Sequence, residues 1–374
     1  MTRSSFSNQL SARQSLILDR LLELLSPAST LVKMENPVLE PIPELCDCMR
    51  LFRLRFNQPN GSPRSFVVKT VKAHEYAIHR LLSTQVSGAT PRVFGGGRVG
   101  ADLTTEWLLV MEDFALGPLV WIAPDEPLPS SKPAPAASAL LLSSFQEALR
   151  LLAIIHARFL DRRSELETCG VRPVHIDPVA LSESVPATCS LLTLCKTLLG
   201  LPLEAPMITE IKRIGVHLAL MLKPLQMDAC WTLVHGDFHF GNLLRDSSGN
   251  IRIADWGSAA IQGPAWDLVL CSETEVAYYV EVMGRCAHIC RNEPEFFSQL
   301  RAAVIYRMYV FIQSAIVSVL NGRSPWMAPA LPICMQRFIE VASSGCFRGG
   351  NAVRFLTSTV HRSSYPSHSE DKQG

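Results

Sequence analysis

The chain has 374 residues, of which 48% are hydrophobic, so it is long and apolar enough to bury one large bilobed unit or two domains. This composition excludes disorder as the general state of the chain. With 35 Lys and Arg against 34 Asp and Glu, the formal net charge is +1. A balance this even argues against attraction to nucleic acid or to an anionic membrane, and we expect neither as a partner.

The N-terminal region predicts a helix and not an export signal. Residues 8–25 mix apolar and charged residues in an amphipathic helical pattern and lack the continuous apolar core of a signal peptide. The chain has 11 cysteines, but the pairs Cys46/Cys48 and Cys286/Cys290 lack the two-residue spacing of structural zinc sites. We therefore expect buried or free thiols and a reducing, cytoplasmic location.

A β-hairpin followed by a helix is predicted next. Residues 50–71 alternate in two strands around a turn at 58–62, and helical spacing begins in the segment 75–82. Lys69 lies inside the second apolar strand, where an ammonium group is costly unless it finds an anion. Glu75 is a candidate partner. The alternatives are that Lys69 extends to solvent from a strand edge and that Glu75 is a favourable charge in a first helical turn.

The middle of the chain predicts a strand, an irregular connection and a helix. Residues 107–114 are apolar and turn polar near their end, and the segment 116–140 is rich in proline, alanine and serine. Residues 142–159 share one apolar helical face. The apolar segment 302–320 is interrupted by Arg307 and Gln313 and is shorter than the run needed to span a bilayer without a break, so we expect a core helix there.

The most informative stretch follows residue 234. Asp237, Asn242 and Asp255 lie at offsets of 5 and 13 residues, and the loop begins His-Gly-Asp. Phosphoryl transfer needs a carboxylate to accept the hydroxyl proton, together with a carboxamide and a second carboxylate to hold magnesium. The spacing matches the protein-kinase catalytic loop, although that loop begins His-Arg-Asp. The alternative is a hairpin with ordinary polar turn residues.

This motif, together with Gly-Pro-Ala-Trp-Asp-Leu at 263–268, resembles the aminoglycoside phosphotransferase and choline kinase family. The resemblance implies an α+β, protein-kinase-like bilobal fold. A small N-terminal antiparallel sheet lobe with one helix would be joined to a larger, mainly helical C-terminal lobe, with ATP in the cleft. The implied activity is ATP-dependent phosphorylation of a hydroxyl group on a small molecule.

The resemblance also implies residue roles. Asp237 would be the catalytic base, Asn242 and Asp255 would bind Mg²⁺, Lys69 would hold the ATP phosphates, and Glu75 would hold Lys69. Further candidates are the adenine-binding strand end (Glu112, Asp113, Phe114) and three residues that support the catalytic loop (His156, His235, Asp267). For Asp267, a plain surface carboxylate is the alternative.

One expected feature is missing from the sequence. The nucleotide-covering loop of this family often contains glycines, but the corresponding residues 41–48 contain none. Two prolines there lack amide donors, and Glu44 and Asp47 would repel phosphate. This is the main support for the alternative function, a catalytically inactive nucleotide-binding or interaction protein of the same fold, whereas the presence of Asp237, Asn242 and Asp255 supports the active enzyme.

The predicted organisation is an N-terminal lobe over 1–115, a linker over 116–140, a catalytic and acceptor-binding lobe over 141–357 and a disordered tail over 358–374. The connection between Asp255 and Asp267 is too short for the activation segment with which protein kinases dock peptides, so we expect a small-molecule acceptor. The glutamates that follow could attract a cationic acceptor or form a solvated face (Glu273, Glu275, Glu281). The sequence leaves the identity of the acceptor and the oligomeric state open.

Overall fold

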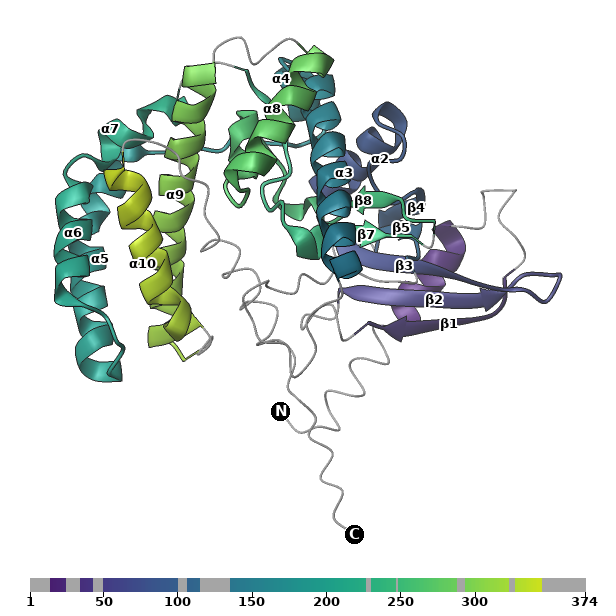
Figure 1. Cartoon of the computed structure of the whole chain (residues 1–374). Coiled ribbons are helices and arrows are strands. Elements are labelled where there is room, and N and C mark those ends of the chain that lie inside the picture. Colours follow the sequence, from purple (N-terminus) through teal and green to yellow (C-terminus); the bar gives the residue numbers. More distant parts are fainter. Residues whose placement is uncertain are drawn as a thin grey trace. The chain divides into compact units, whose positions relative to one another are not determined.

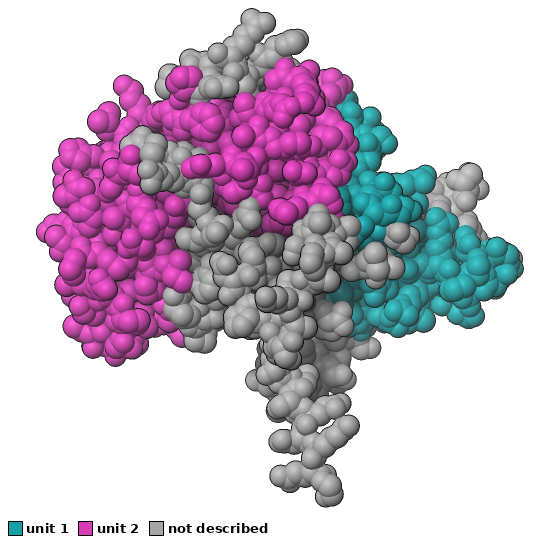
Figure 2. Space-filling model, viewed as in Figure 1, with its two compact units in different colours: residues 1–118, 167–171, 243–259 teal, residues 119–166, 172–242, 260–374 magenta. Residues whose placement is uncertain are grey.

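The computed structural model describes residues 14–24, 34–42, 50–99, 106–114, 135–226, 230–246, 248–287, 293–322 and 327–344. Its contacts divide the chain into two compact units, coloured separately in Figure 2. Unit 1 contains residues 1–118, 167–171 and 243–259; unit 2 contains residues 119–166, 172–242 and 260–374. The hairpin that follows the His-Gly-Asp loop therefore belongs to unit 1, and the loop itself belongs to unit 2.

Several predictions concern residues outside this description. They include Cys46, Cys48 and Cys290, most of the glycine-free loop, most of the predicted linker, and the predicted tail. The end of the predicted linker, residues 135–140, is already helical. The predicted lobe boundaries remain a prediction.

Unit 1 is built on a five-stranded antiparallel sheet with the strand order β1-β2-β3-β5-β4. Figure 1 shows β1, β2 and β3 side by side. The strands are β1 (Glu35–Pro41), β2 (Leu51–Asn57), β3 (Pro63–Val71), β4 (Val93–Arg98) and β5 (Trp107–Glu112). The predicted hairpin is confirmed: the turn between β2 and β3 is closed by the Gln58 amide, which donates to the Ser62 carbonyl at 2.9 Å.

The two faces of the sheet carry separate apolar clusters, because successive side chains of a strand point to opposite faces. Phe66 and Val68 of β3 pack on one face with Ile17 and Leu21, which belong to the predicted amphipathic helix, helical over 14–24. On the other face Val67 and Val71 pack near Leu109 and Met111, and Tyr76 of helix α2 (Ala73–Gln85) covers them. Lys69 lies between Val67 and Val71 in the strand, so it shares the face covered by α2.

A second small hairpin completes unit 1. Strand β7 (Leu243–Arg245) pairs with β8 (Ile251–Ile253), and the 3₁₀ helix η4 (Trp256–Ser258) follows. The Ile253 amide donates to the Ala89 carbonyl at 2.8 Å, and the buried Trp256 indole donates to the Ile253 carbonyl at 3.1 Å. These bonds fix the segment that carries Asp255 to the chain that follows α2.

Unit 2 is mainly helical, which confirms the predicted α+β composition of a sheet-containing part and a helical part. Its helices are α3 (Pro135–Phe159), the first part of α4 (Arg163–Thr168), α5 (Pro178–Leu199), α6 (Ala205–Gly215), α7 (Leu218–Leu222), α8 (Glu273–Ala287), α9 (Glu293–Leu320) and α10 (Met327–Ser343). It also contains the short strand pair β6 (Thr232–Val234) and β9 (Ala260–Gln262) and the 3₁₀ helices η2 (Lys223–Gln226), η3 (Phe240–Asn242) and η5 (Pro264–Leu268).

Two segments, Pro178–Leu199 and Pro294–Leu320, are long and apolar enough to cross a membrane, although core helices of folded domains often pass the same test. Helix α9 packs against α10, α5 and η5 inside unit 2, and Figure 1 shows it beside α10 and α5. Its Gln313 amide donates to the Ser184 hydroxyl at 3.0 Å, and its Arg301 donates to the Ala342 carbonyl at 2.8 Å. Its polar side chains are therefore used in contacts with neighbouring helices, as expected of a core helix.

Candidate active site

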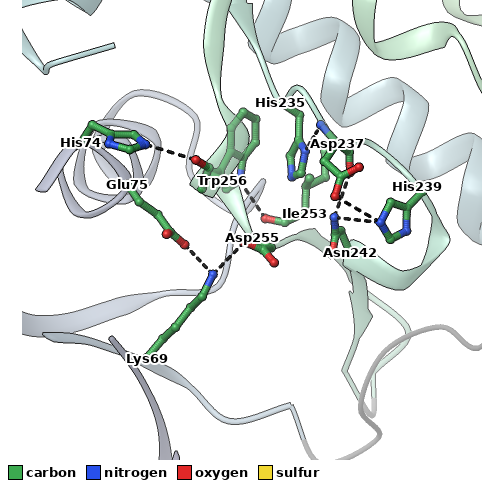
Figure 3. A network of polar contacts seen from close by, with 11 residues as sticks. Lys69, His74, Glu75, His235, Asp237, His239, Asn242, Ile253, Asp255 and Trp256 are labelled. Carbon is green, nitrogen blue, oxygen red and sulfur yellow. Dashed lines mark hydrogen bonds and ion pairs between the residues drawn. The ribbon is translucent and has the colours of Figure 1, made fainter. Parts of the chain in front are cut away.

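Unit 1 contains a compact cluster of charges. The Lys69 ammonium group donates to the Glu75 carboxylate at 2.6 Å and to the Asp255 carboxylate at 2.7 Å (Figure 3). The Glu75 side chain is buried, whereas 53% of the Asp255 side chain is exposed. The pairing of Lys69 with Glu75 is thus present, and Asp255 forms the open side of the cluster.

The backbone places these three groups together. Lys69 lies in the central strand β3, and Glu75 lies in the first turn of α2. Asp255 adopts a left-handed conformation with φ of 61°, uncommon for any residue but glycine yet tolerated by Asp, and this turns the chain from β8 into η4. His74 bonds to the Gly257 carbonyl at 3.1 Å, and a Cβ atom added to Gly257 would lie 3.1 Å from the Glu75 carboxylate. A glycine there lets the backbone approach α2 closely.

The charge state of the cluster follows from its neighbours. Burial alone would lower the pKa of Lys69, but the carboxylates of Asp255 and Glu75 outweigh burial and raise it above its ordinary value. Burial raises the pKa of Glu75 despite the opposing effect of Lys69. Lys69 therefore stays charged at neutral pH.

In unit 2, Asp267 organises the His-Gly-Asp loop. Its carboxylate accepts hydrogen bonds from the His235 amide at 2.6 Å and the Gly236 amide at 2.8 Å, and Gly236 has a left-handed φ of 79°. His156 bonds to the same carboxylate at 3.2 Å and, through its other ring nitrogen, to the Tyr279 hydroxyl at 2.6 Å. Asp267 is 2% exposed and is not a surface carboxylate.

The ionised state of Asp267 suits this role. Burial raises its pKa, but the hydrogen bond and charge of His156, together with the backbone and side chain of His235, outweigh burial and hold the pKa below its ordinary value. An ionised carboxylate can accept each of the hydrogen bonds described above, so the loop is shaped by a buried anion whose partners His156, His235 and Gly236 lie within unit 2.

Asp237 projects from this loop with 47% of its side chain exposed. The Asn242 side-chain nitrogen donates to the Asp237 backbone carbonyl at 2.8 Å, so its carboxamide oxygen stays available as an acceptor (Figure 3). His239 Nε2 lies 3.4 Å from one carboxylate oxygen, and Arg307 Nη2 lies 3.9 Å from the other. Burial raises the pKa of Asp237, but His239, Arg307 and His235 together lower it, so the carboxylate is ionised at neutral pH.

Aromatic packing against helix α3 holds the His-Gly-Asp loop. Phe240 stacks on Phe145 of α3 with ring centroids 4.2 Å apart, and the buried Phe238 lies against the same ring at 5.7 Å. Apolar residues therefore alternate with the polar residues of the motif, and the former anchor the loop to α3.

The predicted adenine-binding residues lie at the end of β5. Glu112 is the last residue of the strand, and its amide donates to the Arg92 carbonyl at 2.9 Å. The Asp113 carboxylate accepts from Arg53 of β2 at 2.8 Å and 3.2 Å, and Phe114 is buried. The side chain of Asp113 thus forms an ion pair within unit 1.

Two residues beside Asp237 have no predicted role: His239 and Arg307. His239 is two residues from Asp237, within the same motif. Arg307 interrupts the apolar run of α9, and a lone charge in a core helix is a sequence signal for a buried partner.

Among the predicted acidic residues of α8, Glu275 caps the helix by accepting from the Ser272 amide at 2.7 Å, and Glu281 forms an ion pair with Arg285.

Comparison with solved structures shows the fold. An aminoglycoside 2'-phosphotransferase in complex with GDP is 13% identical, with a TM-score of 0.54 over 87% of this chain and 98% of that chain. A protein from Ralstonia eutropha JMP134, provisionally assigned as an aminoglycoside phosphotransferase, is 12% identical, with a TM-score of 0.53 over 86% and 97%. An amicoumacin kinase in complex with AMP-PNP and Ca²⁺ is 11% identical, with a TM-score of 0.52 over 93% and 99%. The predicted kinase-like fold is confirmed.

The search of curated proteins found no match. A family profile, in contrast, matches residues 60–281, which include β3, α2, the His-Gly-Asp loop and the segment through Asp267. This range covers more than half of the chain and confirms the predicted family. The chain belongs to the phosphotransferase enzyme family.

Proposed function

We propose that this enzyme transfers the γ-phosphoryl group of ATP to a hydroxyl group of a small molecule in the presence of magnesium. The observation that carries the proposal is Asp237. It is an ionised, half-exposed carboxylate on a loop fixed by a buried anion. A carboxylate in this state can orient an acceptor hydroxyl and accept its proton as the bond to phosphorus forms.

The metal-binding role is assigned to Asn242 and Asp255. Both offer oxygen ligands, which Mg²⁺ prefers, and it usually binds one or two protein groups together with phosphate oxygens and water. The Asn242 nitrogen is already bonded to the loop, and Asp255 is half exposed. Within the described residues no group of three or more His, Cys, Asp or Glu could hold a metal, so the proposal relies on this smaller ligand set. Magnesium, when bound, would neutralise charge on the phosphates.

Lys69 is proposed to bind phosphate oxygens, and Glu75 to position Lys69. The support is the arrangement in unit 1, where a charged ammonium group on a rigid strand is held by a buried carboxylate. Use of a nucleotide is supported by two similar structures, which are complexes with GDP and with AMP-PNP. We assign ATP as the donor and place the adenine against the backbone at Glu112, Asp113 and Phe114.

A small-molecule acceptor is supported by the chain between Asp255 and Asp267. The short helix η4, the strand β9 and the short helix η5 occupy this connection almost completely. Protein kinases present peptide substrates on a long segment at this place. We propose a compact acceptor and a cytoplasmic site of action.

The test is a direct assay. Purified full-length protein is incubated with Mg²⁺ and ATP, or with Mg²⁺ and GTP, and a panel of hydroxyl-bearing metabolites, and products heavier by one phosphate are sought by mass spectrometry. We expect at least one product with wild-type protein and none with Asp237→Asn. Nucleotide binding without any transfer would favour the alternative, a catalytically inactive protein of the same fold.

A further inference from the structure

The two carboxylate oxygens of Asp237 face different partners. Oδ2 lies 3.4 Å from His239, whose same ring nitrogen lies 3.3 Å from the side chain of Asn242, the proposed metal ligand (Figure 3). Oδ1 faces Arg307 of α9 at 3.9 Å. Within unit 2, Arg307 therefore approaches the carboxylate oxygen of Asp237 that does not face His239.

Arg307 is held in place but keeps unused donors. It donates one hydrogen bond to the Gly236 carbonyl, and its guanidinium lies over the Trp266 ring at 5.8 Å from the ring centre. A guanidinium has five N–H donors in a fixed plane. Within the described part of the chain, this is the only hydrogen bond that Arg307 makes, and 26% of its side chain is exposed. The result is a rigid cation beside the catalytic carboxylate with several donors available.

The charges around Asp237 favour an anion there. Arg307 is a permanent cation 3.9 Å from Asp237, and its charge is one of the causes that lower the pKa of Asp237. Two of the acidic residues of α8 already have partners, because Glu275 caps its helix and Glu281 pairs with Arg285. A cationic acceptor would meet Arg307 as a like charge, whereas a carboxylate or phosphate matches the geometry of its guanidinium.

We propose that Arg307 binds an anionic group of the acceptor, so that the enzyme phosphorylates a hydroxyl on a carboxylate- or phosphate-bearing small molecule. This inference rests on the proposed function and narrows its substrate class. In this proposal Arg307 sets the specificity for the acceptor. Its hydrogen bond to the Gly236 carbonyl holds the guanidinium group against the loop that carries Asp237.

The first experiment identifies the acceptor class. Metabolites of a cell extract are separated by ion exchange into cationic, neutral, carboxylate-bearing and phosphate-bearing pools, and each pool is then incubated with the full-length enzyme, Mg²⁺ and γ-labelled ATP. We expect transfer of label mainly in one of the two anionic pools, and which of the two identifies the anion. Label mainly in the cationic or neutral pool would overturn the inference and keep the proposed function. No label in any pool would remove both.

The second experiment tests Arg307 on the labelled acceptor. Loss of charge-assisted hydrogen bonds worth about 1.5–3 kcal/mol should raise the KM for the acceptor about 10- to 100-fold in Arg307→Gln. The KM for ATP should change little. Arg307→Lys keeps the charge and should recover part of the loss. Arg301→Gln, on the same helix with its donors on backbone carbonyls, is the matched control and should leave both KM values unchanged.

A purely structural role gives a different result. If Arg307 only holds Gly236, Arg307→Gln should lower kcat for every acceptor with an unchanged acceptor KM, and Arg307→Lys should not restore the preference for anions. That pattern would overturn the inference whatever the stability of the variants. Their melting temperatures, measured alongside, separate loss of folded protein from loss of specificity.

Discussion

The charged cluster of unit 1 and the buried network of unit 2 use similar residues in opposite ways. Lys69 joins two carboxylates, one of which is half exposed. His156 and Asp267 have fully buried side chains, and their partners are the Tyr279 hydroxyl and two backbone amides. An exposed ion pair can exchange a partner for a ligand at modest cost, whereas a buried anion cannot lose its donors without a large penalty. The cluster around Lys69 is therefore suited to binding a ligand, and the network around Asp267 is suited to holding the His-Gly-Asp loop in place.

The largest effect on turnover is expected for Asp237, the half-exposed carboxylate of the His-Gly-Asp loop. Asp237→Asn removes the proposed proton acceptor and should lower kcat about 10²- to 10⁴-fold. ATP affinity should stay within a few-fold, because the carboxylate acts on the acceptor hydroxyl. A product assay and calorimetric titration with ATP measure the two quantities. Near-normal turnover would exclude Asp237 from the mechanism.

Asp255→Ala should affect the metal as well as the rate. Loss of the proposed metal-binding carboxylate should reduce turnover by orders of magnitude and raise the Mg²⁺ concentration needed for half-maximal activity. Asp246→Ala is the matched control in the same hairpin, because Asp246 bonds to Asn250 in the turn. An Mg²⁺ titration with the same shift in both variants would count against the assignment of Asp255.

Lys69→Met keeps the apolar stem and removes the ammonium group. We expect activity to fall about 100-fold or more, since a charged contact to phosphate is lost. The free energy of unfolding should fall by only about 1–3 kcal/mol, because Glu75 can take up a proton when its partner is removed. Urea denaturation and turnover are measured on the same preparation. Retained activity with a much lower melting temperature would make Lys69 a packing residue.

For Asp267→Asn, in contrast, we expect the main effect on stability and a secondary effect on activity. The substitution places an amide among donors in a buried site and should reduce the free energy of unfolding by about 3–5 kcal/mol. Activity per folded molecule should also fall, since the loop loses its anion. Circular dichroism during urea denaturation measures the loss. A change below 1 kcal/mol would show that the network does not hold the loop.

The smallest expected effect is a pH dependence that sharpens this result. The pKa of Asp267 is below its ordinary value in the folded protein. Its stabilising contribution is therefore complete above the unfolded-state pKa of about 3.9 and is lost as pH falls through the lower folded-state pKa. The difference in stability between wild type and Asp267→Asn should shrink as the pH falls below about pH 4. An unchanged difference at pH 3 would contradict this.

Local patterns explain which elements could be predicted. The β2–β3 hairpin, α2 and α3 appear close to their expected ranges, because strand alternation and helical spacing depend on neighbouring residues. The sequence also allowed the prediction of Asp237, Asn242 and Asp255 as site residues, because a short motif fixes their offsets. The ion pair of Arg53 with Asp113 and the approach of Arg307 to Asp237 depend on packing between distant segments. No periodicity within a window of 15 residues contains that information.

The hydrogen bonds that support the His-Gly-Asp loop have a consequence for the order of folding. The bond from His156 to Asp267 joins residues 111 positions apart, and the bond from His156 to Tyr279 spans 123 positions. Contacts of such sequence separation form late, because closing long loops costs entropy before any contact is gained. During refolding, helix content should therefore return before catalytic competence. A nascent chain that ends before residue 267 would carry every residue of the His-Gly-Asp motif while lacking the carboxylate that shapes it.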